Sequence, residues 1–129
     1  MGNDYKRPKT LDSFTINNIP SQAGNLNLTM CYDNKRLVEV FGEIGKAGSY
    51  ASIQLTVLCR LLSIILQSKL SRTKIMKKIR LGFFDIDWGL PFEYEKKEYT
   101  GHEDFIFKTI TKEIATKKYF KKYLAKKTA

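Results

Sequence analysis

The sequence predicts an α+β fold: a three-stranded antiparallel meander packed by a long hydrophobic helix, followed by a short basic helix and a C-terminal basic helix. Three observations predict it. The first third of the chain alternates apolar and polar residues with the period of β-strands. A long apolar run, Ile53 to Leu66, follows it. The second half carries lysines and apolar residues at helical spacing.

Three strands are expected, over Ser13–Ile19, Asn25–Tyr32 and Arg36–Ile44. The second strand, "NLNLTMCY", alternates most regularly: Leu, Leu, Met and Tyr face one way, and Asn, Asn, Thr and Cys face the other. The residues 33–35, Asp-Asn-Lys, predict a hairpin turn between the second and third strands. The result is a small antiparallel meander with at least one covered face.

The long hydrophobic helix is expected to begin at a cap, Ser49 or Ser52, and to run to about Ser68. It is apolar on nearly every side, so we expect it to be buried on more than one. One side packs on the sheet, and the other requires a second helix or another subunit, which predicts a homo-oligomer formed through this helix. Its polar residues form one narrow stripe: Thr56, Arg60, Ser63 and Gln67.

The remaining chain predicts two basic helices separated by an irregular stretch. Ser71–Arg80 reads as a short helix that Gly82 ends. Residues 83–101 are aromatic and acidic, and we expect them to be irregular. A last helix is expected to begin at His102 or Glu103 and to continue into the lysine-rich end of the chain.

The length of 129 residues is typical of a single domain. We expect residues 1–12 to be a flexible N-terminal segment and residues 13–129 to form one domain with a basic helical extension. The apolar run is broken by polar residues and is too short to span a membrane. The chain does not open with the pattern of a secretory signal. Cys31 and Cys59 fit reduced, buried thiols better than a disulfide framework, so a cytoplasmic location is expected.

The formal charge of +10 indicates a polyanionic partner, and the charge is segregated along the chain. Nucleic acid is one partner, and a solvated lysine face or an acidic protein are alternatives. Tyr119, Phe120 and Tyr123 interleave with the last lysines, and they either stack on bases or belong to the core. The expected nucleic-acid-binding residues are Lys69, Arg72, Lys74, Lys77, Lys78, Arg80, Lys117, Lys118, Lys121, Lys122 and Lys126.

Several short motifs occur in an order that is typical of one known family. They are Gly24 before an alternating strand, then 39–41 (Glu-Val-Phe), 45–48 (Gly-Lys-Ala-Gly), 60–63 (Arg-Leu-Leu-Ser) and 79–82 (Ile-Arg-Leu-Gly). Over about Ser13 to Phe84 the chain resembles the TSCPD domain, the C-terminal domain of vitamin B12-dependent (class II) ribonucleotide reductases.

The family's usual cysteine positions hold other residues in this chain. Ala23 stands before the glycine that opens the strand, Ser49 and Tyr50 follow the Gly-Lys-Ala-Gly corner, and Phe83 and Phe84 replace a Cys-Pro pair. The metal-binding or thiol-relay role that the resemblance implies is therefore not expected here. The candidate zinc ligands Cys31, Cys59 and His102 are too few for a four-ligand site and lie in other contexts. No metal or other cofactor is expected.

The corner between the third strand and the long helix is a candidate phosphate site. Its residues are Gly45, Lys46, Gly48 and Ser49. Glycines allow close backbone approach, and a helix start offers unpaired N–H groups. The alternative is a glycine corner that strand-to-helix packing requires, with the lysine in solvent.

Together these patterns favour a non-enzymatic accessory protein that binds RNA or another single-stranded nucleic acid and supports a larger protein machine. One alternative is an oligomeric protein of the phage type that sequesters a nucleotide or cyclic nucleotide at the Gly45–Lys46 corner. Another is a detached regulatory or docking subunit of a ribonucleotide reductase. The only histidine, His102, lacks the neighbours of a catalytic site, so no enzyme is expected.

Overall fold

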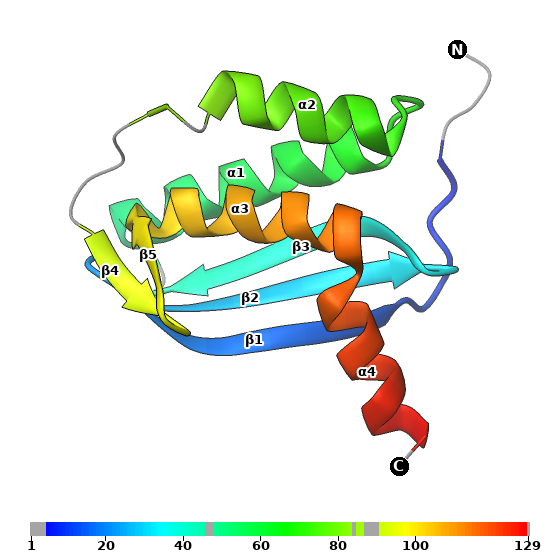
Figure 1. Ribbon diagram of the computed structural model, residues 1–129, viewed down its shortest axis with the longest axis horizontal. Coiled ribbons are helices and arrows are strands. Elements are labelled where there is room, and N and C mark those ends of the chain that lie inside the picture. Colours follow the sequence, from blue (N-terminus) through cyan, green and yellow to red (C-terminus); the bar gives the residue numbers. More distant parts are fainter. Residues whose placement is uncertain (1–4, 46–47, 84, 87–90, 129) are drawn as a thin grey trace.

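The computed structural model describes residues 5–45, 48–83, 85–86 and 91–128. The chain forms the strands β1 (Asp12–Ser21), β2 (Gly24–Asp33) and β3 (Arg36–Ile44), and then the helices α1 (Tyr50–Leu66) and α2 (Arg72–Phe83). A hairpin of β4 (Pro91–Tyr94) and β5 (Lys97–Thr100) precedes α3 (Gly101–Thr116) and α4 (Lys118–Thr128). The predicted α+β class with an antiparallel meander is confirmed (Figure 1).

The meander has the order β1-β2-β3, with antiparallel pairing throughout. Asn34 and Lys35, which join β2 to β3, both have positive φ (55° and 72°), as a two-residue type I′ turn requires. The predicted alternation in β2 holds, because Leu26, Leu28 and Met30 are all fully buried. A β-bulge in β3 adds one residue between the partners of Cys31 and Tyr32.

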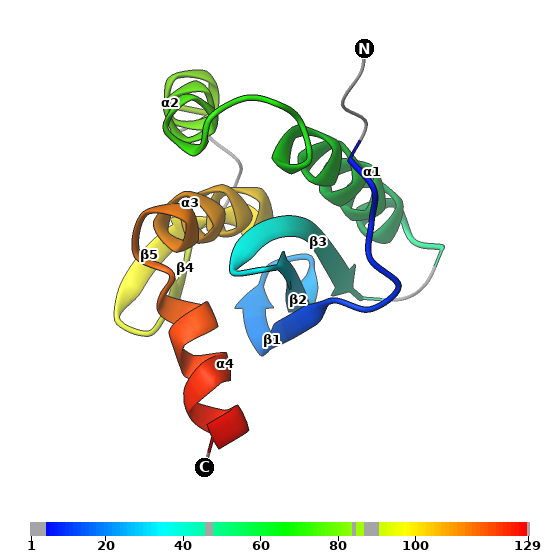
Figure 2. The same ribbon diagram turned by 90° about the vertical axis from the view of Figure 1, so that its right-hand side faces the viewer.

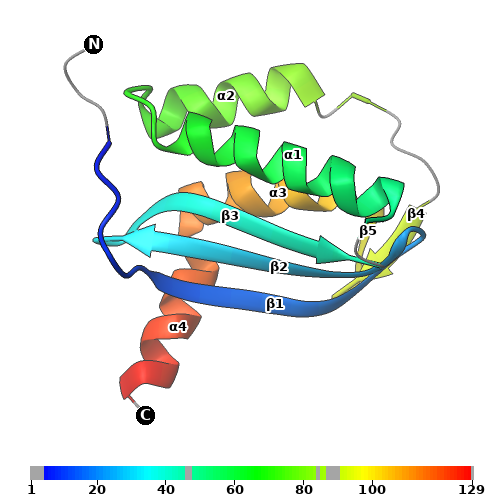
Figure 3. The ribbon, with the colours of Figure 1, turned by 180° about the vertical axis from the view of Figure 1, so that it is seen from behind.

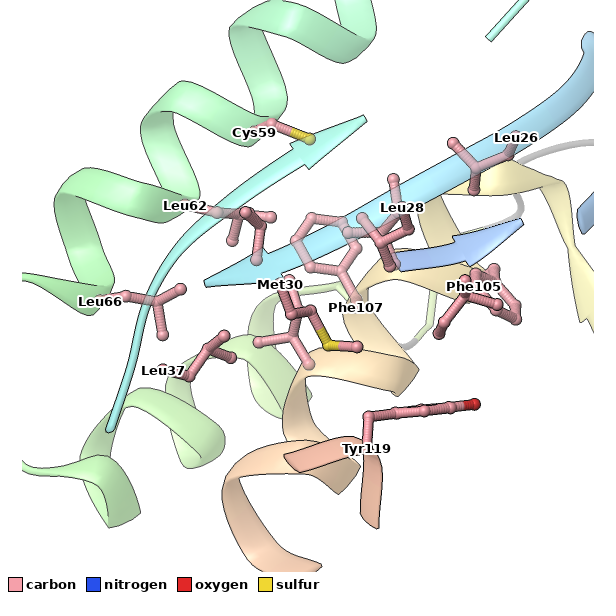
Figure 4. Packing of buried hydrophobic residues seen from close by; sticks show 14 of the residues in the cluster. Leu26, Leu28, Met30, Leu37, Cys59, Leu62, Leu66, Phe105, Phe107 and Tyr119 are labelled. Atoms are coloured by element: carbon pink, nitrogen blue, oxygen red, sulfur yellow. The ribbon is translucent and has the colours of Figure 1, made fainter. Parts of the chain in front are cut away.

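Helix α3 covers one face of the sheet, and α1 lies along β3, one of its two edge strands (Figures 2 and 3). Side chains from β2, β3, α1, α3 and α4 meet in one core (Figure 4). On the opposite face of the sheet, Arg7 of the N-terminal segment pairs with Glu39 at 2.6 Å. None of the helices within the described ranges is long and apolar enough to cross a membrane.

Helix α1 begins as expected, with Ser49 as the cap: its hydroxyl accepts a hydrogen bond from the Ser52 amide at 3.2 Å. Gly42 permits close packing of α1 on β3, since a Cβ there would lie 2.9 Å from Leu55 Cδ2. The polar stripe of α1 has a structural role. Ser63 bonds both the N–H and the C=O of Val40, and Gln67 donates to the Val38 carbonyl at 3.1 Å.

Three expectations for the second half were wrong. Gly82 does not end the short basic helix, because α2 continues to Phe83. Residues 91–100 form a hairpin rather than an irregular stretch, with a turn at Glu95 and Lys96, both at positive φ. The last helix is not continuous, because Lys117 adopts the left-handed conformation (φ 54°) and separates α3 from α4. The hairpin and the break at Lys117 matter for the charged surface, since each changes which lysines lie together.

A candidate nucleic-acid interface

The lysine-rich surface of α2 is held in place by two buried isoleucines. Ile75 and Ile79 lie in the core on one side of the helix. The helix also packs beside α3. The basic side chains on the other sides are exposed to solvent: Lys74, Lys77, Lys78 and Arg80.

The break between α3 and α4 is stabilised by a buried carboxylate. Glu113 is 1% exposed, and its two oxygens accept hydrogen bonds from the amides of Tyr119 (2.8 Å) and Phe120 (2.9 Å). These amides belong to the first turn of α4, where N–H groups lack helical partners and a negative charge is favoured. The side chain of α3 therefore caps α4 and fixes the position of Lys117 between them.

A pocket of about 400 Å³ lies at the end of the molecule where the α3–α4 junction, the β2–β3 turn and the start of α2 meet. Figure 2 faces this end, with α2 above and α4 below. Three predicted residues reach the pocket, namely Lys69, Arg72 and Lys117. Two further basic residues, Lys35 and Arg36, join them from the β2–β3 turn. Five cationic side chains that are distant in sequence thus line one concave site.

The two arginines of the pocket are positioned by the C-terminal end of α1. Arg72 Nη2 donates to the Leu66 carbonyl at 3.0 Å, and Arg36 Nη2 donates to the carbonyls of Leu66 (3.4 Å) and Ser68 (3.3 Å). Carbonyls at a helix end lack helical partners and carry partial negative charge. The guanidinium groups are therefore held close together although both are cationic.

Arg72 is the most perturbed cation in this pocket. Burial, with a smaller contribution from the neighbouring Arg36, lowers the pKa of Arg72 to about 10. Its Nη1 atom is buried and has no hydrogen-bond partner among the described residues. A buried charged donor without a partner is costly. An anion in the pocket can offset the repulsion between the two guanidinium groups.

The rest of the pocket wall is mainly apolar and comes from Leu37, Leu70, Ile114 and Tyr32. Among the described residues that line it, the only acid is Glu113, whose oxygens are already engaged by the amides of α4 and the Tyr32 hydroxyl. The pocket consequently combines a cationic rim with an apolar wall. This arrangement suits a ligand with a phosphate group and a planar apolar part.

The lysines of α4 lie over aromatic rings. Lys118 and Lys122 are 5.2 and 5.3 Å from the ring centroid of Tyr119, and Lys126 is 5.6 Å from that of Phe14. Lys118 also pairs with Glu95 at 3.6 Å, whereas Lys121 is exposed. These cation–π contacts hold the charges along one helix.

The aromatic residues of α4 are core residues. Tyr119 and Phe120 are buried, and Tyr123 donates a hydrogen bond to Asp12 of β1 at 2.7 Å. Of the two roles considered for these rings, the structure therefore gives them the packing role, and α4 offers charge rather than stacking surfaces.

The glycine corner lies at the opposite end of α1 from the basic pocket. Gly45 and Gly48 both have positive φ (57° and 83°), and Ser49 caps α1. Lys46 lies outside the described residues. The structure does not bring this candidate phosphate site together with the basic pocket, since the 17 residues of α1 separate them.

The other chemically capable side chains do not form a cluster. Within the described ranges, no three His, Cys, Asp or Glu side chains gather closely enough to hold a metal ion. His102 is buried beside Glu103, with 3.4 Å between Nε2 and Oε2. Cys31 and Cys59 are buried as free thiols.

Sequence reasoning did not include Lys35 and Arg36 in the site. The turn that carries them was identified, but only as a connection between strands. Their role depends on the α3–α4 junction, more than 70 residues away, where Lys117 lies. A local sequence pattern does not show that residues so far apart in the chain lie close together in the fold.

Comparison with known proteins identifies the domain type. A family model described as the TSCPD domain matches residues 3–114, which include β1 to β5, α1, α2 and nearly all of α3. No curated protein and no solved structure matched the chain.

Proposed function

Because the chain belongs to the TSCPD domain family and carries a basic pocket between two lysine-rich helices, we propose that it is a non-enzymatic accessory protein that binds RNA or another single-stranded nucleic acid. It acts in the cytoplasm in support of a larger nucleic-acid-processing machine. The nucleic acid enters the pocket with one nucleotide and follows the lysines of α2 and α4 with its backbone.

The convergence of cations in the pocket carries this proposal. A solvated lysine face does not require charges from three separate segments to meet, and it does not bury a guanidinium atom that lacks a partner in the described part of the chain. Phosphate offsets the like charges that meet in the pocket, and arginine binds phosphate with well-defined geometry. The like charges along α2 and α4 are also relieved when phosphates lie beside them.

The apolar wall of the pocket favours a single strand over a duplex. A base that is not stacked in a helix can lie against Leu37, Leu70 or Ile114 while its phosphate contacts the rim. In a duplex the bases remain stacked inside the helix, so no base can contact the apolar wall of the pocket. The same wall distinguishes this site from a surface that only attracts phosphates.

Salt dependence provides the first test. Fluorescence anisotropy with labelled single-stranded RNA, single-stranded DNA and duplexes is measured across a range of salt concentrations. For single strands, the logarithm of the binding constant falls with the logarithm of salt concentration, with a slope of about −0.7 per neutralised phosphate. Absence of binding at micromolar protein, or binding that salt does not weaken, contradicts the proposal.

Charge reversal within the pocket provides the second test. The double variant Lys35→Glu/Lys117→Glu is expected to weaken single-strand binding about tenfold or more at fixed salt, because both side chains line the pocket. The matched control is Lys6→Glu/Lys9→Glu, which changes the net charge equally at two exposed positions outside the pocket. Equal losses for the two variants indicate attraction by net charge alone and contradict a specific site.

A further inference from the structure

A second cavity lies between the β4–β5 hairpin and α3, next to the start of α4. It has a volume of about 400 Å³. Strand β5 packs beside α3, and the hairpin forms the outer wall of the cavity (Figure 1). Among the described residues that line it, none also lines the basic pocket. The cavity is therefore a separate site, which the proposed nucleic-acid contact does not use.

The hairpin turns an aromatic face toward α3. The ring centroids of Phe92, Tyr94 and Tyr99 lie 6.3, 5.4 and 4.9 Å from that of Phe105 in α3. Lys97 is the cross-strand partner of Tyr94 and lies two residues before Tyr99, so strand alternation places it on this same face. A lysine thus stands among aromatic residues on the side of the hairpin that faces the helix.

Lys97 meets a second lysine in the cavity. Lys112 of α3 lines the same wall as Lys97. Direct contact with Lys97 and repulsion from its charge lower the pKa of Lys112, and Glu95 opposes this effect only in part. An ammonium group donates hydrogen bonds and accepts none, so neither lysine can satisfy the other. The pair requires acceptor oxygens from another group.

The other two lysines of the cavity already have acidic partners. Lys108 pairs with Asp104, with 3.1 Å between Nζ and Oδ2. Lys118 pairs with Glu95, with 3.6 Å between Nζ and Oε2. These two ion pairs border the cavity and leave its charge balance to Lys97 and Lys112.

Within the described part of the chain, Lys97 and Lys112 form no salt bridge. Glu98 is the remaining acid of the cavity wall, but it is the cross-strand partner of Glu93. Strand alternation therefore directs its side chain to the face of the hairpin opposite to that of Lys97. Two adjacent positive charges remain without a balancing carboxylate.

The chemistry of the cavity matches a phosphate monoester. Near neutral pH such a group carries about −1.5 to −2 charge and three terminal oxygens, enough to accept from both ammonium groups and to balance their charge. A phosphodiester carries a single negative charge. The volume lies in the range of small-molecule sites, and the rings of Tyr94 and Tyr99 line the rest of it. A planar organic part of the ligand can pack against these rings.

We propose that this cavity binds the phosphate monoester of a nucleoside, with the phosphate between Lys97 and Lys112 and the base against Tyr94 and Tyr99. A free nucleoside monophosphate and the phosphorylated end of a strand share this chemistry. The proposal does not depend on the nucleic-acid binding proposed for the basic pocket.

Calorimetric titration with the four ribonucleoside 5′-monophosphates tests the site. At least one is expected to bind with a stoichiometry of one per chain, and its nucleoside and its 3′,5′-cyclic monophosphate, a diester, are expected to bind about tenfold or more weakly. No binding of any of the four at millimolar concentration, or equal affinity for the monoester and the cyclic diester, overturns the proposal.

Substitution of the lysine pair tests the position of the phosphate. Lys97→Gln and Lys112→Gln, both at exposed positions, are each expected to weaken nucleotide binding about tenfold. The matched control is Lys121→Gln, an exposed position of α4 outside the cavity, which is expected to bind as the parent protein does. Thermal unfolding without nucleotide shows whether each variant is folded. Equal losses in all three variants indicate attraction by net charge and overturn the proposal.

A variant of the basic pocket separates the two sites. Lys35→Gln/Lys117→Gln removes two charges of that pocket and is expected to leave nucleotide affinity within about threefold of the parent value at physiological salt, because screening weakens distant charges. Loss of nucleotide binding in this variant places the nucleotide in the basic pocket and overturns the present proposal, while the proposed function stands.

Competition in the same double variant identifies the source of the monoester. Displacement of the nucleotide by a 5′-phosphorylated oligonucleotide, but not by its 5′-hydroxyl form, shows that a strand end fits the cavity. Displacement by neither shows that the site takes free nucleotides, and both results support the proposal. Equal displacement by the two forms overturns it, because the site then does not recognise a monoester.

Discussion

The hydroxyl of Tyr32 in β2 donates a hydrogen bond to the Glu113 carboxylate in α3. Both residues are almost completely buried, at 2% and 1% exposure. The same carboxylate accepts the two amides that begin α4. One acidic group therefore joins the central strand, the main core helix and the last helix, and its burial is compensated because both of its oxygens accept hydrogen bonds.

Glu113→Gln is expected to lower the free energy of unfolding by about 2 kcal/mol, because an amide NH₂ then faces a backbone N–H that needs an acceptor. Tyr32→Phe removes only one donor and is expected to cost about 1 kcal/mol. Denaturant unfolding followed by circular dichroism measures both. The control is Glu43→Gln, at an exposed position of β3, with an expected change within about 0.5 kcal/mol. Equal stability of Glu113→Gln and the parent protein contradicts this account.

Gly42→Ala is expected to destabilise the protein by about 1–3 kcal/mol, because the new Cβ lies 2.9 Å from the side chain of Leu55, a buried residue of α1 that packs on β3. Gly82→Ala provides the matched control. A Cβ at that position of α2 meets no atom within 4 Å, so the same substitution is expected to be neutral or stabilising by up to about 1 kcal/mol. Thermal unfolding of the two variants side by side is the measurement. A Gly42→Ala variant as stable as Gly82→Ala argues against close packing of α1 on β3.

Stability is expected to decrease as the pH falls below about 6.5, the ordinary pKa of histidine. Burial lowers the pKa of His102, and Glu103 opposes this only in part. The folded state then binds fewer protons than the unfolded state, so protonation favours unfolding by up to about 1.4 kcal/mol per pH unit over the range between the two pKa values. Above pH 6.5 the imidazole is neutral in both the folded and the unfolded state, so the free energy of unfolding no longer depends on its protonation.

The difference in unfolding free energy between the parent protein and His102→Gln, measured as a function of pH, isolates this effect from the carboxylates. The difference is expected to be constant above neutral pH and to change below it. A difference that remains constant down to pH 5 or increases in the parent protein's favour contradicts the expected direction.

The two cysteines are expected to react slowly in the folded protein. Burial raises the pKa of Cys31 to about 11, with Glu39 adding to the effect, and raises the pKa of Cys59 to about 12. Thiolate is the reactive form, so near neutral pH both should be modified by an aromatic disulfide reagent about 100-fold or more slowly than in denaturant. One thiol per chain that reacts at once under native conditions contradicts this expectation.

The meander and α1 were predictable because the apolar positions of the local sequence pattern are largely the positions that the fold buries. Alternation in β2 and the Ser49 cap are signals within a few residues of the structure they determine. The β4–β5 hairpin was missed because its turn, Glu95-Lys96, lacks the Gly or Asn that usually marks such turns. The break at Lys117 was missed for a related reason: the apolar spacing stays helical across it, and the cap comes from Glu113 rather than from the residues at the start of α4.

The site was only partly predictable. Charge segregation singled out Lys69, Arg72 and Lys117 with the other basic residues, and the structure brings these three to one pocket. The same list also contained lysines that lie on the outer surfaces of α2 and α4. What distinguishes the pocket residues is tertiary: they surround the end of α1, whose carbonyl at Leu66 binds Arg36 and Arg72.

Ser63 and Gln67 have a consequence for the behaviour of this protein at high concentration. By bonding the outward N–H and C=O groups of Val38 and Val40, they leave the open side of β3 with fewer groups to which a foreign strand can add. On the other side of the sheet, a bulge before Ile19 and the presence of Pro20 interrupt β1. Growth of fibrils by strand addition is therefore hindered at both edges of the sheet, although the chain exposes much aliphatic surface.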